Sequence, residues 1–138
     1  MKQYQYDLAA LILRITIGIM FLAHGLTKLL VFTPAGTAQF FASLGLPEFL
    51  AYLTIVFEIG GGICLVLGIL VRIISWLTFL QMIVISFIHS SNGWSFGNAG
   101  GGWEYPAFMS LTALSLALIG SGRFTVLARI KNQKTIKD

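Results

Sequence analysis

Charged residues are scarce in this chain: they make up 10% of its 138 residues, whereas 57% are hydrophobic. Cysteine occurs once and proline three times. A single cysteine excludes a disulfide within the chain, and we expect Cys64 to be a small packing residue. The mean hydropathy of +0.85 excludes an ordinary soluble domain. The composition therefore predicts an integral membrane protein.

Four apolar runs account for most of the chain. They predict transmembrane helices over roughly 8–32, 49–70, 73–90 and 103–119. The first run is too long for a signal peptide and lacks a cleavage site, so we expect it to remain as a helix. The predicted fold is an all-α, integral membrane four-helix bundle, forming one membrane domain over 1–138 with a basic tail over 121–138.

Basic residues predict the orientation in the membrane. They follow the fourth predicted span or lie in the link between the second and third, as Arg72, Arg123, Arg129, Lys131, Lys134 and Lys137. The other two loops, 33–48 and 91–102, contain no Lys or Arg. Because positive residues stay in the cytoplasm, we expect a multi-pass protein of the cell (inner) membrane with both termini cytoplasmic. The net charge of +4 then reflects topology and contact with the lipid bilayer, and no motif supports a nucleic-acid partner.

The two outer loops differ in composition. The first begins Thr33–Pro34 and ends with Gly45–Pro47, which predicts a short interfacial helix that lies over the bundle as a lid. The second, SNGWSFGNAGGGW, has five glycines among thirteen residues and predicts a mobile loop at the membrane surface. Gly100–Gly102 lack the Lys-Ser/Thr of a phosphate-binding loop.

Five ionisable residues lie in or beside the predicted spans. They are His24, Lys28, Glu58, His89 and Glu104. A charge in hydrocarbon is costly unless it is paired or faces a wet cavity, so such residues mark a functional site. All five belong to the predicted outer half of the bundle, and we expect them to form one pocket. Arg14 lies near the inner end and is interpreted as a snorkelling residue.

Helical geometry predicts that the polar residues converge. At 100° per residue, each predicted helix carries one seam of polar or small residues, and we expect the four seams to face inward. The seams comprise Arg14, Gly18, His24, Gly25 and Lys28; Thr54, Glu58, Gly61 and Gly62; Ser75, Thr78, Gln81 and His89; and Glu104, Thr112 and Ser115.

Several longer phrases resemble those of a known family. They are LRITIGIMFLAHGLTKL at Leu13–Leu29, FFASLGLP at Phe40–Pro47, FEIGGGICLVLGILVR at Phe57–Arg72, IH at Ile88–His89, GGWEYP at Gly101–Pro106 and GSGRF at Gly120–Phe124. From about Leu11 to Phe124 the chain resembles the DoxX family of small four-span membrane proteins. The resemblance implies a four-helix membrane bundle associated with redox chemistry. Related proteins are described as the quinone-reducing subunit of a thiosulfate:quinone oxidoreductase, or as membrane partners of other oxidoreductases.

One interpretation of the cluster is a site for a bound quinone. His24, His89 and Lys28 can donate hydrogen bonds to its carbonyls. Glu58 and Glu104 can pass protons to the outer surface. The aromatic residues that could form the pocket wall are Phe21, Phe57, Trp94 and Trp103. Electrons would come from a redox partner protein, because the chain shows no flavin, haem or iron–sulfur motif of its own.

Other interpretations stay open. The cluster can neutralise itself by pairing Lys28 with Glu58 or Glu104, which would make the protein a non-catalytic membrane scaffold. A metal site ranks lower, because no Glu-x-x-His or His-x-x-x-His pair exists, and we predict none. A transporter also ranks lower, because no internal repeat is evident, although a homo-oligomer could supply one. The preferred prediction is a redox- or quinone-linked membrane subunit, with a polar ligand pocket in the outer half of the bundle, that acts at most within an oxidoreductase.

Overall fold

The computed structural model describes residues 1–126 and 128. The described residues form five α-helices: α1 (Lys2–Leu26), α2 (Pro34–Ser43), α3 (Phe49–Leu67), α4 (Val71–Ile88) and α5 (Glu104–Ile119). A π-helical turn, η1 (Thr27–Val31), continues α1, and a 3₁₀ turn, η2 (Ser90–Asn92), follows α4. This part of the chain contains no strand, so the all-α prediction is confirmed.

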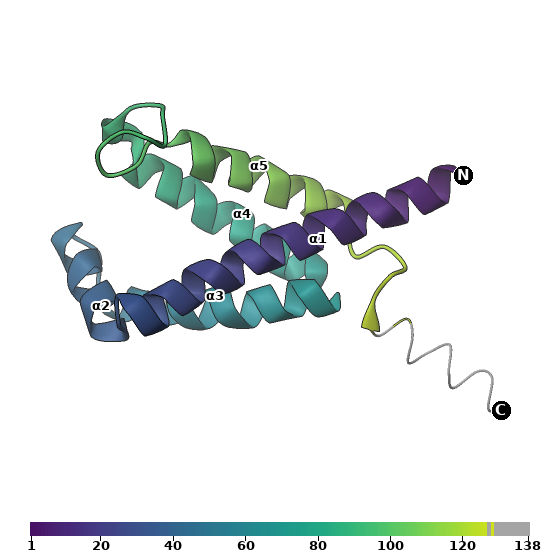
Figure 1. Ribbon diagram of the computed structural model, residues 1–138, viewed down its shortest axis with the longest axis horizontal. Coiled ribbons are helices and arrows are strands. Elements are labelled where there is room, and N and C mark those ends of the chain that lie inside the picture. The colour runs from purple at the N-terminus through teal and green to yellow at the C-terminus, as the bar shows by residue number, and fades with distance from the viewer. Residues whose placement is uncertain (127, 129–138) are drawn as a thin grey trace.

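The helices pack mainly as two pairs, α1 with α3 and α4 with α5 (Figure 1). Helix α1 runs diagonally and also contacts α5, which joins the pairs. The two pairs diverge toward the end that carries α2 and the loop between α4 and α5. The shared core, nearer the crossing, consists of Ile17, Phe21, Leu65, Val71, Met82, Met109, Ala113 and Leu116.

Glycines bring α1 and α3 close together. A Cβ atom on Gly62 would lie 2.8 Å from the carbonyl oxygen of Gly18 and 3.0 Å from the backbone nitrogen of Leu22. A Cβ on Gly25 would lie 2.7 Å from Cγ1 of Ile59. Small residues of this kind let the backbones of membrane helices approach. Gly18, Gly25 and Gly62 of the first two predicted seams therefore form the α1–α3 contact, whereas Gly61 faces Ile74 on α4.

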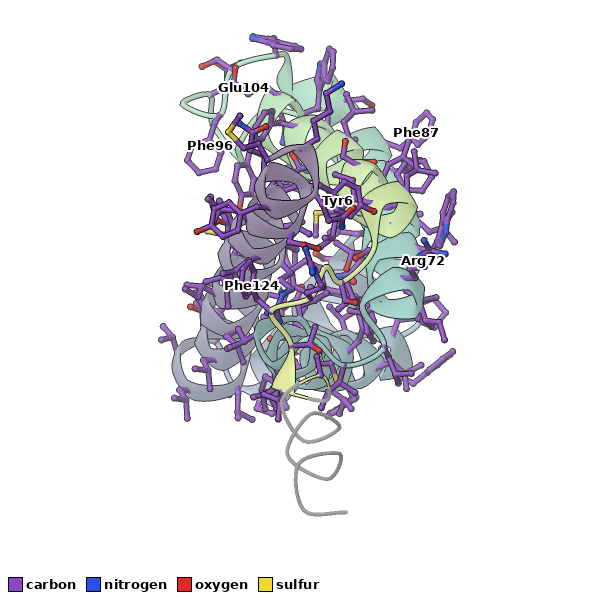
Figure 2. The ribbon with its side chains drawn as sticks, turned by 90° about the vertical axis from the view of Figure 1, so that its right-hand side faces the viewer. Tyr6, Arg72, Phe87, Phe96, Glu104 and Phe124 are labelled. Carbon is purple, nitrogen blue, oxygen red and sulfur yellow. The ribbon has the colours of Figure 1, made fainter. Side chains whose placement is uncertain are left out.

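Three helices are long and apolar enough to cross a membrane. They are the continuous α1–η1 segment Lys2–Val31, with 30 residues, α3 with 19 and α4 with 18. Helix α5 is apolar but shorter, with 16 residues, or about 24 Å at the helical rise. Large apolar side chains cover the outside of these helices, as Phe87 shows where it points away from α4 (Figure 2).

The predicted boundaries need small corrections. Helix α1 begins at Lys2 rather than near 8, because polar residues can continue a helix beyond its hydrophobic run. Helix α3 ends at Leu67 rather than near 70, because Gly68 takes φ +76° and terminates it in the left-handed conformation. The short helix predicted in the first outer loop is present as α2, where the Thr33 hydroxyl accepts a hydrogen bond from Gly36 N at 3.1 Å.

The inward-facing seam predicted for the fourth helix is wrong. Ser115 is exposed, and its hydroxyl donates to the carbonyl of Leu111 at 2.9 Å. Thr112 donates to the carbonyl of Phe108 at 2.7 Å. A hydroxyl that bonds to its own helix needs no polar partner across the bundle. The buried face of α5 instead carries Pro106, Met109, Ser110, Ala113, Leu116 and Ala117.

The interpretation of Arg14 as a snorkelling residue is also wrong. Arg14 is 2% exposed, and its guanidinium donates to the carbonyls of Leu65 at 3.2 Å and Val66 at 2.9 Å, and to that of Phe124. The last carbonyls of a helix lack partners within the helix, and a cation is favoured there. Arg14 therefore caps the end of α3 from inside the bundle.

Candidate functional site: a polar pocket between the helix pairs

The π-helical turn η1 sets the position of Lys28. Within it, Phe32 N donates to the carbonyl of Thr27 at 3.0 Å, five positions back. A π-type turn inserts a residue relative to the α-helical repeat and redirects the side chains that follow, and such turns are frequent at functional sites. The Lys28 ammonium faces α3 in this arrangement.

Glu58 is the centre of the polar contacts. Lys28 Nζ donates to Glu58 Oε1 at 2.9 Å and to Oε2 at 2.7 Å. Gln81 Nε2, on α4, donates to Oε1 at 3.1 Å. The Glu58 side chain is 2% exposed and that of Lys28 is 20% exposed. A buried carboxylate is stable only when it is paired and hydrogen-bonded, and Glu58 meets both conditions.

A second polar contact joins α1 to α5. The Tyr105 hydroxyl lies 3.5 Å from His24 Nε2, and the two ring centroids are 6.2 Å apart. Phe96, from the loop between α4 and α5, packs against Tyr105 with centroids 5.8 Å apart. This contact and the Glu58 contacts together link α1, α3, α4 and α5.

His89 has a defined tautomer. Its Nδ1 lies 2.9 Å from the carbonyl oxygen of Ile85. Because a carbonyl only accepts, Nδ1 carries the hydrogen, and Nε2 of the neutral ring is an acceptor. Nε2 forms no hydrogen bond with the residues that the structure describes. His89 thus offers an acceptor that the described part of the chain does not use.

Glu104 has a different role from the other four ionisable residues. Its Oε1 accepts a hydrogen bond from Phe96 N at 2.8 Å, and the two side chains lie at the same end of the molecule in Figure 2. Asn92 Nδ2 adds bonds to the carbonyls of Gly100 at 3.1 Å and Gly101 at 2.9 Å. The loop that composition predicts to be mobile is therefore held by side-chain hydrogen bonds.

The helices enclose a cavity of about 630 Å³, which we call the polar pocket. Four of the five ionisable residues, His24, Lys28, Glu58 and His89, line it, and Glu104 does not. All five helices contribute to its wall, which is mostly apolar. Its other lining residues include Phe21, Phe40, Phe41, Leu44, Leu46, Leu50, Thr54, Gln81, Met82, Ile85, Phe96, Tyr105, Pro106 and Met109.

Of the four aromatic residues predicted for the wall, only Phe21 lines the polar pocket. Phe57 packs edge-on against Phe21, with ring centroids 5.8 Å apart, on the side of the core. Trp94 and Trp103 pack against each other, with centroids 4.5 Å apart, and both lie outside the set of lining residues. Phe40, Phe41 and Phe96 take the places expected for the other three.

Two residues that take part in the polar contacts of the pocket, Gln81 and Tyr105, are absent from the predicted set. Gln81 belongs to the predicted third seam but carries no charge, so charge alone does not select it. Tyr105 directly follows Glu104 in the sequence. Consecutive residues of a helix point about 100° apart, so Tyr105 does not belong to the seam predicted from Glu104. A search for every hydrogen-bonding side chain within the apolar runs would have found both.

The arrangement suits a small, largely apolar ligand with polar groups. The pocket volume lies within the usual range for small-molecule sites, and its polar groups are few and convergent. Among the described residues, 1–126 and 128, no three side chains of His, Cys, Asp or Glu come together as metal ligands. Hydrogen bonding and proton exchange are the chemistry that the pocket residues themselves can provide.

Comparison with known proteins identifies the family. The DoxX family model matches residues 9–91. The chain is 37% identical over 122 residues to "Putative oxidoreductase CatD" of Bacillus subtilis (strain 168), covering 88% of this chain and 86% of that protein. It is 28% identical over 130 residues to "Inner membrane protein YqjF" of Escherichia coli (strain K12), covering 93% and 95%. No solved structure matches significantly. The chain therefore belongs to the DoxX family and is a membrane protein.

Proposed function

We propose that this protein is a membrane subunit of a redox system and binds a quinone in the polar pocket. One observation carries the proposal: a mostly apolar cavity of about 630 Å³ receives hydrogen-bonding groups from four helices. A quinone combines a flat apolar ring with two carbonyl acceptors. It needs a pocket with apolar walls and a few donors, which is the chemistry of this cavity.

The polar groups offer specific contacts to such a ligand. An ammonium and an amide each carry more N–H groups than the bonds to Glu58 use, so Lys28 and Gln81 keep donors for a ligand carbonyl. In its neutral form the His89 ring, with Nδ1 donating to Ile85, presents Nε2 as an acceptor, which suits the hydroxyl of a quinol. The site can therefore bind the oxidised and the reduced ligand through different residues.

The redox step requires a partner. A quinone becomes a quinol by taking up two electrons and two protons. In this proposal an electron-donating oxidoreductase supplies the electrons, and the pocket residues relay protons. The relative named "Putative oxidoreductase CatD" supports a redox role. The resemblance of the chain to proteins described as quinone-reducing subunits points to the same ligand class.

The same proposal includes a placement in the membrane. Helices α1, α3, α4 and α5 are its four spans, and α2 lies in the interface beside the polar pocket. The end with α2 and the α4–α5 loop faces outward, and both termini are cytoplasmic. The distribution of Lys and Arg supports this orientation. The relative named "Inner membrane protein YqjF" supports location in the inner membrane.

A second candidate is a non-catalytic membrane partner protein. It is favoured by the Lys28–Glu58 pair, which neutralises itself and leaves no unpaired carboxylate on Glu58. In that case the pair fixes how α1, α3 and α4 pack and binds no substrate.

The deciding experiment compares bound quinone with folding. The protein is purified gently from its own membranes, and the quinone retained per chain is measured by extraction and native mass spectrometry. Glu58→Gln and His24→Ala are compared with Glu48→Gln, which alters an exposed glutamate outside the pocket. We expect stoichiometric quinone in the parent and the control, and its loss from the folded fraction of both pocket variants. A parent that binds no quinone, together with a lower folded yield of the pocket variants, contradicts the proposal and favours the structural role.

A further inference from the structure

A second cavity, of about 820 Å³, lies along the first half of α1, away from the polar pocket. Its lining residues come from α1, from the end of α3 and from the segment after α5. We call it the arginine pocket, because Arg14 and Arg123 both line it, together with Asp7. The polar pocket shares no residue with it.

Both carboxylate oxygens of Asp7 accept hydrogen bonds within the protein. It is 2% exposed, and its Oδ2 accepts from Arg123 Nε at 2.7 Å. Its Oδ1 accepts from Arg123 N at 3.1 Å and from Gln3 Nε2 at 3.3 Å. One carboxylate and two guanidinium groups therefore line the arginine pocket, and its charged residues carry a net charge of one positive unit.

Arg14 supplies the excess charge. It is 2% exposed and pairs with no carboxylate in the described part of the chain. Its Nε is buried and has no hydrogen-bond partner among these residues. Gly68 makes room for the guanidinium, because a Cβ atom there would lie 2.5 Å from Arg14 Nη1. A buried donor without a partner is costly and points to a ligand.

The rest of the arginine pocket is apolar and partly open. Leu11, Ile15 and Val66 form its wall, and Leu67 and Phe124 at its edge are 37% and 43% exposed. The Arg123 side chain is 70% exposed, so the N–H groups that Asp7 does not use remain accessible. Accessible cationic donors beside an apolar wall fit an amphiphile with an anionic head group.

We propose that the arginine pocket binds an anionic phospholipid. The phosphate lies between Arg14 and Arg123 and balances the excess positive charge, and an acyl chain lies along the apolar wall. Basic pockets between membrane helices on the cytoplasmic side bind anionic lipid head groups through such contacts. This site is independent of any ligand in the polar pocket.

The test measures lipid retention by native mass spectrometry. Delipidated protein is incubated with a mixture of phosphatidylglycerol and phosphatidylcholine, and we expect a preference for phosphatidylglycerol. Arg123→Gln is expected to lower this preference about fivefold, the effect of one basic residue at a membrane surface. Arg72→Gln is the matched control, because Arg72 is exposed and does not line the arginine pocket. It should retain the preference of the parent protein.

Asp7→Asn separates lipid binding from a structural role. It removes the competing carboxylate but keeps an oxygen that can accept from Arg123 N. We therefore expect it to retain more phosphatidylglycerol, even if its thermal stability falls. A structural ion pair alone predicts that stability and lipid retention fall together, which would overturn the proposal. Equal effects of Arg123→Gln and Arg72→Gln, no lipid preference in the parent, or displacement of the lipid by excess inorganic phosphate would also overturn it.

Discussion

Lys28 donates to both carboxylate oxygens of Glu58, 30 positions away, at distances of 2.9 and 2.7 Å. The pair joins the π-helical turn after α1 to the middle of α3, and Gln81 adds a bond from α4. Both residues of the pair line the polar pocket, whose wall is otherwise mostly apolar. The pair therefore contributes to the packing of the helices and to the surface that a ligand would meet.

Removing one partner of this pair should cost more stability than removing both. Lys28→Met leaves the 2% exposed Glu58 carboxylate without a cation. We expect a loss of about 3 kcal/mol, the low end for buried pairs, because Lys28 keeps some exposure. The double variant Lys28→Met/Glu58→Met should recover most of this loss. Thermal unfolding in detergent measures both, and equal losses would contradict a buried pair.

The α1–α3 contact should be sensitive to a single methyl group. Gly62→Ala would place Cβ 2.8 Å from the carbonyl oxygen of Gly18. Relieving this contact requires the backbone of a helix to move, which is costly. We expect a loss of about 1–3 kcal/mol, typical of overpacking. Gly60→Ala is the matched control on the same helix, because a Cβ there meets nothing within 4 Å. Unfolding measurements that rank the two variants equally would argue against this close approach.

Arg14 should stabilise the end of α3. Arg14→Met removes the charged donor to the carbonyls of Leu65 and Val66, and we expect a loss of about 2–3 kcal/mol. Arg72→Met is the control, since the exposed Arg72 forms no side-chain hydrogen bond with the described residues. Hydrogen exchange of the last turn of α3 localises the effect. Unchanged exchange there would show that Arg14 is not the cap.

Glu104 should control the order of the loop between α4 and α5. Glu104→Ala removes the acceptor for Phe96 N, so we expect faster hydrogen exchange at residues 93–103. Glu104→Gln keeps an oxygen acceptor and should exchange more slowly than the alanine variant. Glu48→Ala, at an exposed glutamate before α3, should leave the loop unchanged. Identical exchange in all three variants would refute this role.

The orientation is testable by cysteine labelling from each side of the membrane. In a Cys64→Ser background, Gly97→Cys should react with an impermeant reagent added outside, and Lys2→Cys only after the membrane is opened. The distribution of positive charges on which this orientation rests includes residues 129–137, which lie outside the described residues. The reverse labelling pattern would overturn the proposed topology.

Composition and hydrophobic periodicity by themselves determined the class of this protein and its helices, and longer sequence phrases indicated its family. Apolar runs of about 20 residues have few alternatives to a membrane helix, because every backbone polar group must be satisfied within the segment. The α2 helix was equally predictable from the sequence, since Thr33 and Pro34 define its start locally. Helix ends were less predictable, because Gly68 ends α3 in the left-handed conformation and hydropathy carries no information about that turn.

Tertiary structure decided which polar residues meet. Selection by charge predicted Glu104 as a pocket residue and left out Tyr105 and Gln81. In the structure Glu104 binds the loop between α4 and α5, whereas Tyr105 and Gln81 line the polar pocket. Packing also buried Arg14 and Asp7, which look like ordinary residues near a helix end. The physical reason is that a side chain's partners depend on how neighbouring helices cross and on a π-helical turn at Lys28, and neither is encoded in the local sequence pattern.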